Sequence, residues 1–334
     1  MIDLSFQSHL TRGRGSKRET AMTLALAALS HAPSFGNVDP GGDTFAQIQG
    51  AIGDVQEFVK DFDPELVVVL GPDHFNGVLY SMMPPFAIGA QAEGVGDYGT
   101  KAGPLSVDSE SARRLHALVL EQGIDVARSE ALKVDHGVMQ PMEFVFGHGF
   151  ELPFVPIFVN SLGLPLTPMR RIREFGEALG RAAQELDKRV LLMASGGISH
   201  NPPIPRWDGA PGTLQERLIQ YSPSREEREE REQKIIRGIQ AIADGKASSE
   251  PLNQEWDELL LDTFRSGDMT AVDQWANDWF IAEGGSAAHE MRTWIAAFSA
   301  LSVQGEYQMD VDRYWPVPTW GAGFGICAAR GVSK

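Results

Sequence analysis

From Met22 onward, short runs of apolar residues alternate with longer segments in which apolar residues recur every three or four positions. The short runs, which are typical of buried strands, cover 24–29, 66–70, 154–159 and 190–193. The helical spacing covers 48–59, 109–122 and 167–186. Strands that alternate with helices in this way predict an α/β fold, with a largely parallel central sheet that helices cover on both faces.

Beyond Pro202 the pattern becomes mainly helical, which predicts a helical C-terminal part. The helical segments are 224–245, 259–264, 275–281 and 291–301. Ser224 and Glu227 have the spacing of a capping box and mark the start of a charged helix, whose Arg/Glu face we expect in solvent. The aromatic, proline-rich tail 314–320 is expected to pack on the body of the protein.

The first 21 residues differ from the rest of the chain. They contain basic residues beside Gly and Ser, and they lack the apolar segment of a secretory signal. We interpret 1–21 as a disordered basic extension rather than an organellar targeting signal, and we predict a single catalytic domain over 22–330. Because no apolar run reaches the roughly 18–20 residues that span a bilayer, we expect a cytoplasmic protein without a membrane partner.

Composition narrows the possible functions. The 334 residues carry a formal net charge of -16, which disfavours electrostatic binding to nucleic acid or to an anionic membrane surface. Cys327 is the only cysteine, so the chain has neither an internal disulfide nor a cysteine-based metal cluster. Any bound metal must therefore be held by histidine and carboxylate side chains.

Histidines follow three of the predicted strands by a few residues: His31, His74 and His200. In open α/β sheets, ligand and catalytic groups gather at the carboxyl ends of the strands. A single loop histidine is more often merely hydrogen-bonded, but three at one sheet edge indicate a shared site. Two further histidines, His136 and His289, also stand beside Asp, Gly or Glu.

Two imidazoles and one carboxylate are the ligand set of non-haem Fe(II) oxygenases, and zinc hydrolases use the same set. At this point both kinds of metal site remain open. Asp73 and Asp135 directly precede His74 and His136. Each aspartate could orient an imidazole ring or cap its own turn, and we weigh these two interpretations equally.

Five segments taken together resemble the class III (LigB-type) extradiol ring-cleavage dioxygenases. They occur in the order and spacing of that family and are 29–33, 72–77, 134–137, 196–203 and 288–294. Segments 81–86 and 320–325 match as well. The resemblance extends from about Met22 to Arg330, and it implies a LigB-like fold for this part of the chain.

The resemblance implies an Fe(II) cofactor bound by His31, His74 and Glu290, with His136 and His200 transferring protons. We assign His200 as the base that deprotonates the substrate and His136 as the acid, although the two could act as a coupled pair. On a helix His289 would point about 100° away from its neighbour Glu290, so we interpret it as structural.

The implied reaction is extradiol cleavage of a 3-substituted catechol by O2 in the breakdown of aromatic compounds, for example of 3-(2,3-dihydroxyphenyl)propionate. Two alternatives are a zinc hydrolase on the same scaffold and a non-enzymatic binding protein of the same fold. We also expect a homo-oligomer, since aromatic residues near the C-terminus could supply subunit contacts: Trp315, Trp320 and Phe324. Candidates for lining the substrate-ring pocket are Phe75, Met82, Met83 and Phe86.

Overall fold

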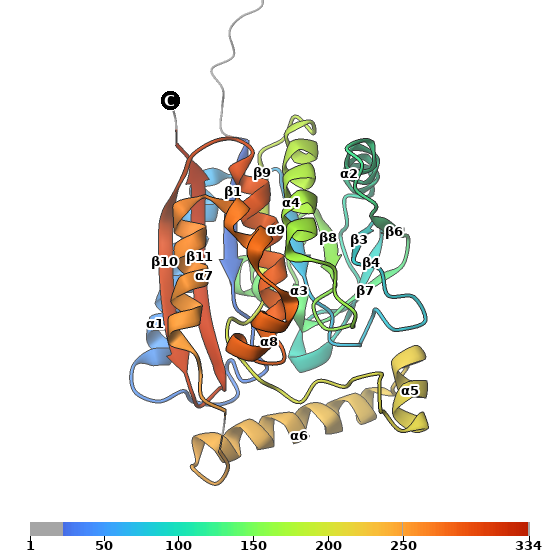
Figure 1. Ribbon diagram of the computed structural model, residues 1–334, viewed down its shortest axis with the longest axis vertical. Coiled ribbons are helices and arrows are strands. Elements are labelled where there is room, and N and C mark those ends of the chain that lie inside the picture. Colours follow the sequence, from blue (N-terminus) through green and yellow to red (C-terminus); the bar gives the residue numbers. More distant parts are fainter. Residues whose placement is uncertain (1–22, 249, 333–334) are drawn as a thin grey trace, which may run out of the picture.

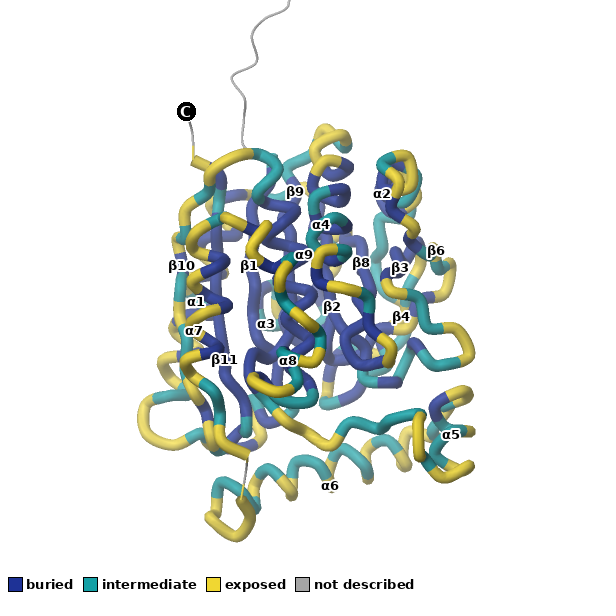
Figure 2. Tube along the Cα trace, in the orientation of Figure 1, coloured by how far each residue is buried: buried dark blue, intermediate teal, exposed yellow. Residues whose placement is uncertain are grey.

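The four apolar runs form the centre of the sheet in a computed structural model that describes residues 23–248 and 250–332 (Figure 1). Four parallel strands lie side by side in the order β1 (Leu24–Leu29), β9 (Val190–Ser195), β2 (Leu66–Gly71) and β8 (Phe154–Val159). All of their residues are buried because helices cover both faces (Figure 2). The predicted α/β class and parallel sheet centre are confirmed.

Antiparallel pairing extends this centre on both sides to an eight-stranded mixed sheet. β11 (Ala322–Gly331) pairs with β1, and β10 (Tyr307–Val317) pairs with β11. On the other side, β3 (Phe86–Gly89) is antiparallel to β8, and β6 (Ala127–Ser129) is parallel to β3. A three-stranded sheet contains β5 (Ala102–Pro104), β4 (Ala92–Val95) and β7 (Leu132–Val134). The C-terminal hairpin β10–β11 follows the predicted helical part and was not predicted.

Helices pack on both faces of the large sheet, where they close two apolar cores. One face carries α1 (Thr44–Phe62) and α3 (His136–Phe146). The opposite face carries α2 (Ser109–Glu121), α4 (Met169–Gln184), α7 (Gln254–Ser266), η2 (Met269–Gln274), α8 (Asn277–Gly284) and α9 (Met291–Ser302). The predicted helices are therefore present. Helix α4 begins after Pro168, one residue later than predicted, because Pro168 itself has extended backbone angles.

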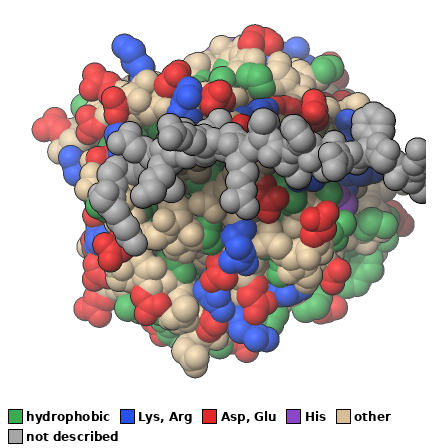
Figure 3. All heavy atoms as spheres, turned by 90° about the horizontal axis from the view of Figure 1, so that it is seen from above, with side chains coloured by type: hydrophobic (Ala, Val, Ile, Leu, Met, Phe, Trp, Pro, Cys, Tyr) green, Lys and Arg blue, Asp and Glu red, His purple; other side chains and the backbone are tan. Residues whose placement is uncertain are grey.

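Two helices, α5 (Gly212–Ile219) and α6 (Arg225–Ala243), cross below the edge where the parallel strands end (Figure 1). The predicted capping box of Ser224 and Glu227 starts α6. None of the residues in α6 is buried, as its charged sequence indicates, but Ile236 and Ile239 pack against the body. The upper, opposite end of the molecule carries interspersed acidic and basic side chains (Figure 3).

The C-terminal tail packs on the body as predicted. Trp320 and Phe324 are buried in the chain's own core, and the Trp320 indole donates a hydrogen bond to the Val38 carbonyl. These two side chains therefore form no exposed surface for subunit contacts, and the homo-oligomer stays a prediction. The predicted extension 1–21 lies outside the described residues. Across the described part of the chain, no helix has both the length and the apolar character of a membrane span.

Candidate active site

The five predicted site residues meet at the edge of the sheet below the parallel strands. Strand β1 leads to His31, β2 leads to His74, and β9 leads through a short loop to His200. His136 begins α3, and Glu290 closes the short helix η3 (Ala288–Glu290). The common edge thus brings together side chains from widely separated parts of the chain.

Three of these side chains converge most closely. The Nε2 atoms of His31 and His74 lie 3.4 Å apart. The Glu290 carboxylate lies 3.3 Å from Nε2 of His74 and 3.6 Å from Nε2 of His31. The side chains of His31 and Glu290 are buried, whereas that of His74 is 22% exposed, so the cluster is reachable from one side.

Hydrogen bonds fix the far sides of these three groups. His31 Nδ1 is 2.8 Å from the Ser195 hydroxyl, and His74 Nδ1 donates to the Asp135 carboxylate at 3.0 Å. The Gly197 backbone N–H donates to the Glu290 carboxylate at 3.0 Å. With both Nδ1 atoms engaged in this way, both Nε2 atoms face the centre of the cluster.

The two Asp-His pairs turn out to be different. The Asp73 carboxylate accepts the backbone N–H groups of 76–78 and so caps its own turn. The Asp135 carboxylate accepts both the backbone N–H and the ring Nδ1–H of His74. Asp135 therefore orients a histidine, but that histidine is His74 and not its own neighbour His136.

The partner of His136 is Asp97, which sequence reasoning missed. The Asp97 carboxylate accepts the His136 ring Nδ1–H at 2.6 Å and its backbone N–H at 2.8 Å. Asp97 opens η1 (Asp97–Gly99), in which the ring of Tyr98 packs edge-on at 4.7 Å from the ring of His136. In the sequence, only the position of a polar residue in a glycine-rich loop marked Asp97.

His200 lies in a loop that neighbouring segments hold in place. Its ring Nδ1–H donates to the Ile198 carbonyl at 3.0 Å, and its Nε2 lies 3.3 Å from the Glu290 carboxylate. Its backbone N–H donates to the Gly284 carbonyl. On the other side of the loop, Ile198 N–H donates to the carbonyl of Gly323 in β11, and Gly323 N–H donates to the carbonyl of Ser199. The position of this histidine thus depends on the C-terminal hairpin.

Burial and charge set the protonation of the cluster. Burial lowers the pKa of His31 to about 3, so this imidazole is neutral near pH 7. Burial acts to raise the pKa of Glu290, but the charge of His200 and the hydrogen bonds from His200 and His74 outweigh it and hold that pKa well below its usual range. A neutral imidazole beside an ionised carboxylate is a donor set suited to a divalent metal.

A third imidazole also lies near the cluster. The donor atoms of His31, His74 and His136 lie within 4.8 Å of one another, and those of Asp97, Asp135 and His136 meet the same limit. The site thus contains a buried group of histidines and carboxylates that could hold a metal ion.

The other histidines lie apart from this cluster. His289 is buried, with its ring stacked on Phe280 at 5.3 Å and its Nδ1 accepting a hydrogen bond from Arg292. His116 and His148 contact Val126 and Glu143 away from the site, and His9 lies outside the described residues. The structural interpretation of His289 agrees with these contacts.

The four residues proposed to line the substrate-ring pocket lie in different surroundings. Phe75 is buried directly after His74, whereas Met82 is 76% exposed. The ring of Phe86 stacks on Phe175 at 4.0 Å in the core, and Met83 lies against Gly163. Of the four residues, Phe75 is the one directly adjacent in sequence to a residue of the histidine cluster.

Residues 25–325 match the protein family described as the catalytic LigB subunit of aromatic ring-opening dioxygenase. The chain belongs to this family. The predicted enzyme class, an extradiol ring-cleavage dioxygenase, is confirmed with it. The zinc hydrolase and the non-enzymatic binding protein are therefore set aside.

Individual relatives are similar over nearly their whole length. The chain is 48% identical over 314 residues to a protein of Rhodococcus sp and 46% identical over 314 residues to one of Rhodococcus jostii (strain RHA1), covering 94% of this chain and 100% of each relative. It is 42% identical to a protein of Burkholderia vietnamiensis (strain G4 / LMG 22486), with 92% of this chain and 98% of the relative covered. All three are named 2,3-dihydroxyphenylpropionate/2,3-dihydroxicinnamic acid 1,2-dioxygenase. A solved structure of an uncharacterized protein from Escherichia coli K12 aligns with a TM-score of 0.49 at 16% identity, covering 92% of this chain and 99% of that one.

Proposed function

We propose that this dioxygenase uses Fe(II) and O2 to open the ring of 2,3-dihydroxyphenylpropionate, and of the corresponding cinnamate, beside the hydroxyl groups. The observation that carries the proposal is the convergence of His31, His74 and Glu290 within 3.3–3.6 Å, beside two further histidines. The choice of substrate rests on the relatives that are 42–48% identical over nearly their full length.

Ring orientation supports His31, His74 and Glu290 as the iron ligands. A metal lies close to the plane of each imidazole that binds it, along the lone pair of the nitrogen. The planes of His31 and His74 are inclined at 88°, so their Nε2 lone pairs can meet at one ion. His136 stacks on His74 at 4.2 Å with only 22° between the rings, and lone pairs in nearly parallel planes do not meet. His136 is therefore assigned to proton transfer.

Bound iron would supply the redox chemistry that couples the catechol to O2. The chain contributes a ligand set with one negative charge and positions left open for small molecules. Ser195, Asp135 and the Gly197 N–H hold the three ligands from behind. Such outer contacts fix ring orientation, and their loss typically weakens metal binding about 10- to 100-fold.

His200 is assigned as the base that removes a proton from a catechol hydroxyl. Its Nδ1–H is held by the Ile198 carbonyl, so the neutral ring carries its free lone pair on Nε2. That Nε2 lies 3.3 Å from the Glu290 carboxylate, within the space where the hydroxyls of a bound catechol would lie. The side chain is 14% exposed, which allows the proton to be exchanged with solvent.

His136 is assigned as the acid that protonates the substrate during rearrangement. The Asp97 carboxylate accepts the Nδ1–H at 2.6 Å, which leaves Nε2 as the nitrogen that passes a proton to the substrate. The edge of the Tyr98 ring and the face of the His74 ring hold the imidazole between them. This pairing of imidazole and carboxylate is the usual way to fix the tautomer of a proton-transferring histidine.

The direct test begins with anaerobic loading of the enzyme with Fe(II). Separate samples then receive 2,3-dihydroxyphenylpropionate or 3-propylcatechol, followed by air-saturated buffer. We expect a yellow ring-opened product whose mass exceeds that of the substrate by two oxygen atoms. Zinc-loaded enzyme serves as the control and is expected to give no product. Enzyme that demonstrably contains iron but opens no catechol ring would contradict the proposed function.

A further inference from the structure

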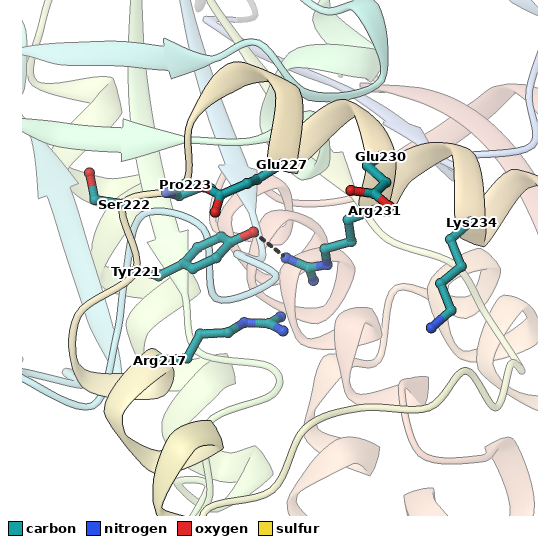
Figure 4. A pocket seen from close by; sticks show the side chains of 8 residues that line it. All are labelled: Arg217, Tyr221, Ser222, Pro223, Glu227, Glu230, Arg231 and Lys234. Carbon is teal, nitrogen blue, oxygen red and sulfur yellow. Dashed lines mark hydrogen bonds between the residues drawn. The ribbon is translucent and has the colours of Figure 1, made fainter.

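A recess between α5 and α6 contains basic side chains without acidic partners (Figure 4). It has a volume of about 500 Å³, and its charged lining residues are Arg217, Arg231, Lys234, Glu227 and Glu230. Three cations and two carboxylates give this lining a net charge of +1, on a chain whose net charge is -16. Local positive charge in an acidic protein indicates a place for an anionic ligand.

Two guanidinium groups share one aromatic ring in this recess. Arg217 and Arg231 lie 4.9 Å and 5.6 Å from the centroid of the Tyr221 ring, and Arg231 donates a hydrogen bond to the Tyr221 hydroxyl at 3.1 Å. Both guanidinium groups are turned toward the same space in Figure 4. Among the described residues, neither forms an ion pair with a carboxylate.

The positive charges of Arg217 and Arg231 repel each other in this recess. Partial burial lowers the pKa of Arg217, and the charge of Arg231 lowers it further. An anion between the two groups would remove this repulsion and provide the planar, two-pronged contact that guanidinium groups offer to carboxylates. The recess is therefore suited to a carboxylate ligand.

The helices that form the recess adjoin the histidine cluster. On α5, Leu218 follows Arg217 and packs in an apolar cluster with Phe75 and Ala287. These two residues directly follow His74 and directly precede η3, which ends in Glu290. The inner wall of α5 is thus next to the segments that supply two of the proposed ligands.

Helix α6 adjoins the cluster from the other side. Arg228 donates a hydrogen bond to the Val95 carbonyl, and Glu232 lies beside the backbone of Tyr98. The ring of Tyr98 in turn packs on His136. Arg231 lies on the same helix, one residue before Glu232, so this side of the recess adjoins the segment that packs on His136.

The histidine cluster cannot itself hold the acidic side chain of the substrate. Three buried carboxylates lie within it, those of Asp97, Asp135 and Glu290, and negative charge at this place repels another anion. A cation must lie beyond the ring of the bound catechol. Arg206 lies outside this recess and lines a separate pocket together with Asp208.

We propose that Arg217 and Arg231 bind the side-chain carboxylate of the substrate and so select catechols that carry an acidic substituent. This inference rests on the proposed function, because it concerns the far end of the same substrate. Tyr221 holds the two guanidinium groups side by side, and α5 and α6 together form the specificity wall of the site.

The test compares two substrates that differ only in charge, 2,3-dihydroxyphenylpropionate and 3-propylcatechol. In iron-loaded Arg217→Gln and Arg231→Gln enzymes, we expect kcat/KM for the acid to fall about 10- to 100-fold, as for loss of a charge-assisted contact. We expect kcat/KM for 3-propylcatechol to change less than about threefold. Arg225→Gln removes an exposed charge at the start of α6, where Arg225 pairs with Glu229, and is the matched control.

Binding provides a second readout that needs no turnover. 3-Phenylpropionate, which lacks both hydroxyls, is expected to compete with the acidic substrate in the parent and Arg225→Gln enzymes and to lose this ability in the two recess variants. Equal losses for both catechols would overturn the inference, as would loss of acid preference in Arg206→Gln alone. If the parent enzyme cleaves neither catechol, the proposed function fails instead.

Discussion

Glu290 and His289 are adjacent in the chain but belong to different surroundings. Glu290 faces His31 and His74, while His289 stacks on Phe280 and accepts a hydrogen bond from Arg292. They lie in the 3-10 helix η3, where successive residues are rotated by about 120°, so they separate as the roughly 100° rotation expected for an α-helix predicts. Because they lie on different sides of the same turn, Glu290 joins the histidine cluster and His289 packs in the core.

The assigned roles of Glu290 and His200 can be separated by substitution. We expect Glu290→Gln to lose iron, because the amide cannot supply the negative charge of the ligand set. His200→Ala is expected to keep iron but lose turnover about 10²- to 10⁴-fold, the usual contribution of proton transfer. Iron content and kcat measured on the same samples provide the check, with the exposed His148→Ala as control. Loss of iron from His200→Ala would contradict the separation of ligands from proton-transfer groups.

His289 predicts an acid sensitivity of the fold. Burial, with a contribution from Arg292, lowers its pKa to about 3 from 6.5, so in acid the unfolded chain takes up a proton that the folded chain excludes. The stability that depends on the neutral ring is complete above pH 6.5 and falls by about 1.4 kcal/mol per pH unit below it. Urea unfolding of the metal-free proteins at pH 7, 6 and 5 measures this effect. The free energy of unfolding should decline less in His289→Gln than in the parent protein. Parallel declines for the two proteins would refute this role.

Asp97 shows where reading single residues reaches its limit. The convergence of the five proposed site residues could be predicted because each lies in a recognisable motif. Asp97 lies in a loop of the small sheet, and nothing local connects it with His136. Only the packing of η1 against the start of α3 creates the pair. From residue type alone, one could predict that His136 has a carboxylate partner. That this partner is Asp97 became clear only from the fold.

At the scale of elements, helices α4 and α9 approach closely through glycine. A Cβ atom on Gly176 would lie 2.2 Å from the Ala296 carbonyl oxygen, and one on Gly180 would lie 2.2 Å from that of Ala300. Both contacts are with backbone atoms, which cannot rotate away. The spacing of these two glycines, one helical turn apart, therefore sets the distance between the helices.

We expect Gly176→Ala to destabilise the protein by about 1–3 kcal/mol, because the helices must separate to admit the methyl group. The matched control is Gly53→Ala in α1, where an added Cβ meets nothing within 4 Å. This control should be neutral or stabilising by up to about 1 kcal/mol, since alanine favours the helix. Urea midpoints of the two variants measure the difference. Similar midpoints for both would show that the α4–α9 contact is looser than described.

The central strands could be predicted from the sequence, whereas the C-terminal hairpin could not, and burial explains the difference. The four central strands are buried on both faces, so uninterrupted apolar runs mark them almost to the residue. β10 lies at the sheet edge and exposes every second side chain or so, while β11 consists largely of small residues. Neither pattern differs enough from a loop to indicate a strand. The hairpin is stabilised by pairing with β1, a partner near the other end of the chain.

For the whole molecule, the sequence indicates the sheet and the helical layers that cover it. It does not indicate where the polar helices α5 and α6 lie on them. Parallel strands between helices dictate a covered sheet and a site at its carboxyl edge. The position of α5 and α6 across that edge follows from a few contacts, such as Ile236 on the core and Arg228 on Val95. A charged helix with no buried residue could lie on many surfaces. The recess between the two helices was therefore visible only in the structure.

The pairing of β1 with β11 determines when the site can form during synthesis. β1 emerges from the ribosome well before Glu290 and before its antiparallel neighbour β11. Until then β1 has one open, apolar edge, the kind of surface that joins strands of other chains. This edge closes only once β11 pairs with β1. A polypeptide released before β11 would retain most of the core yet lack the support that holds His200.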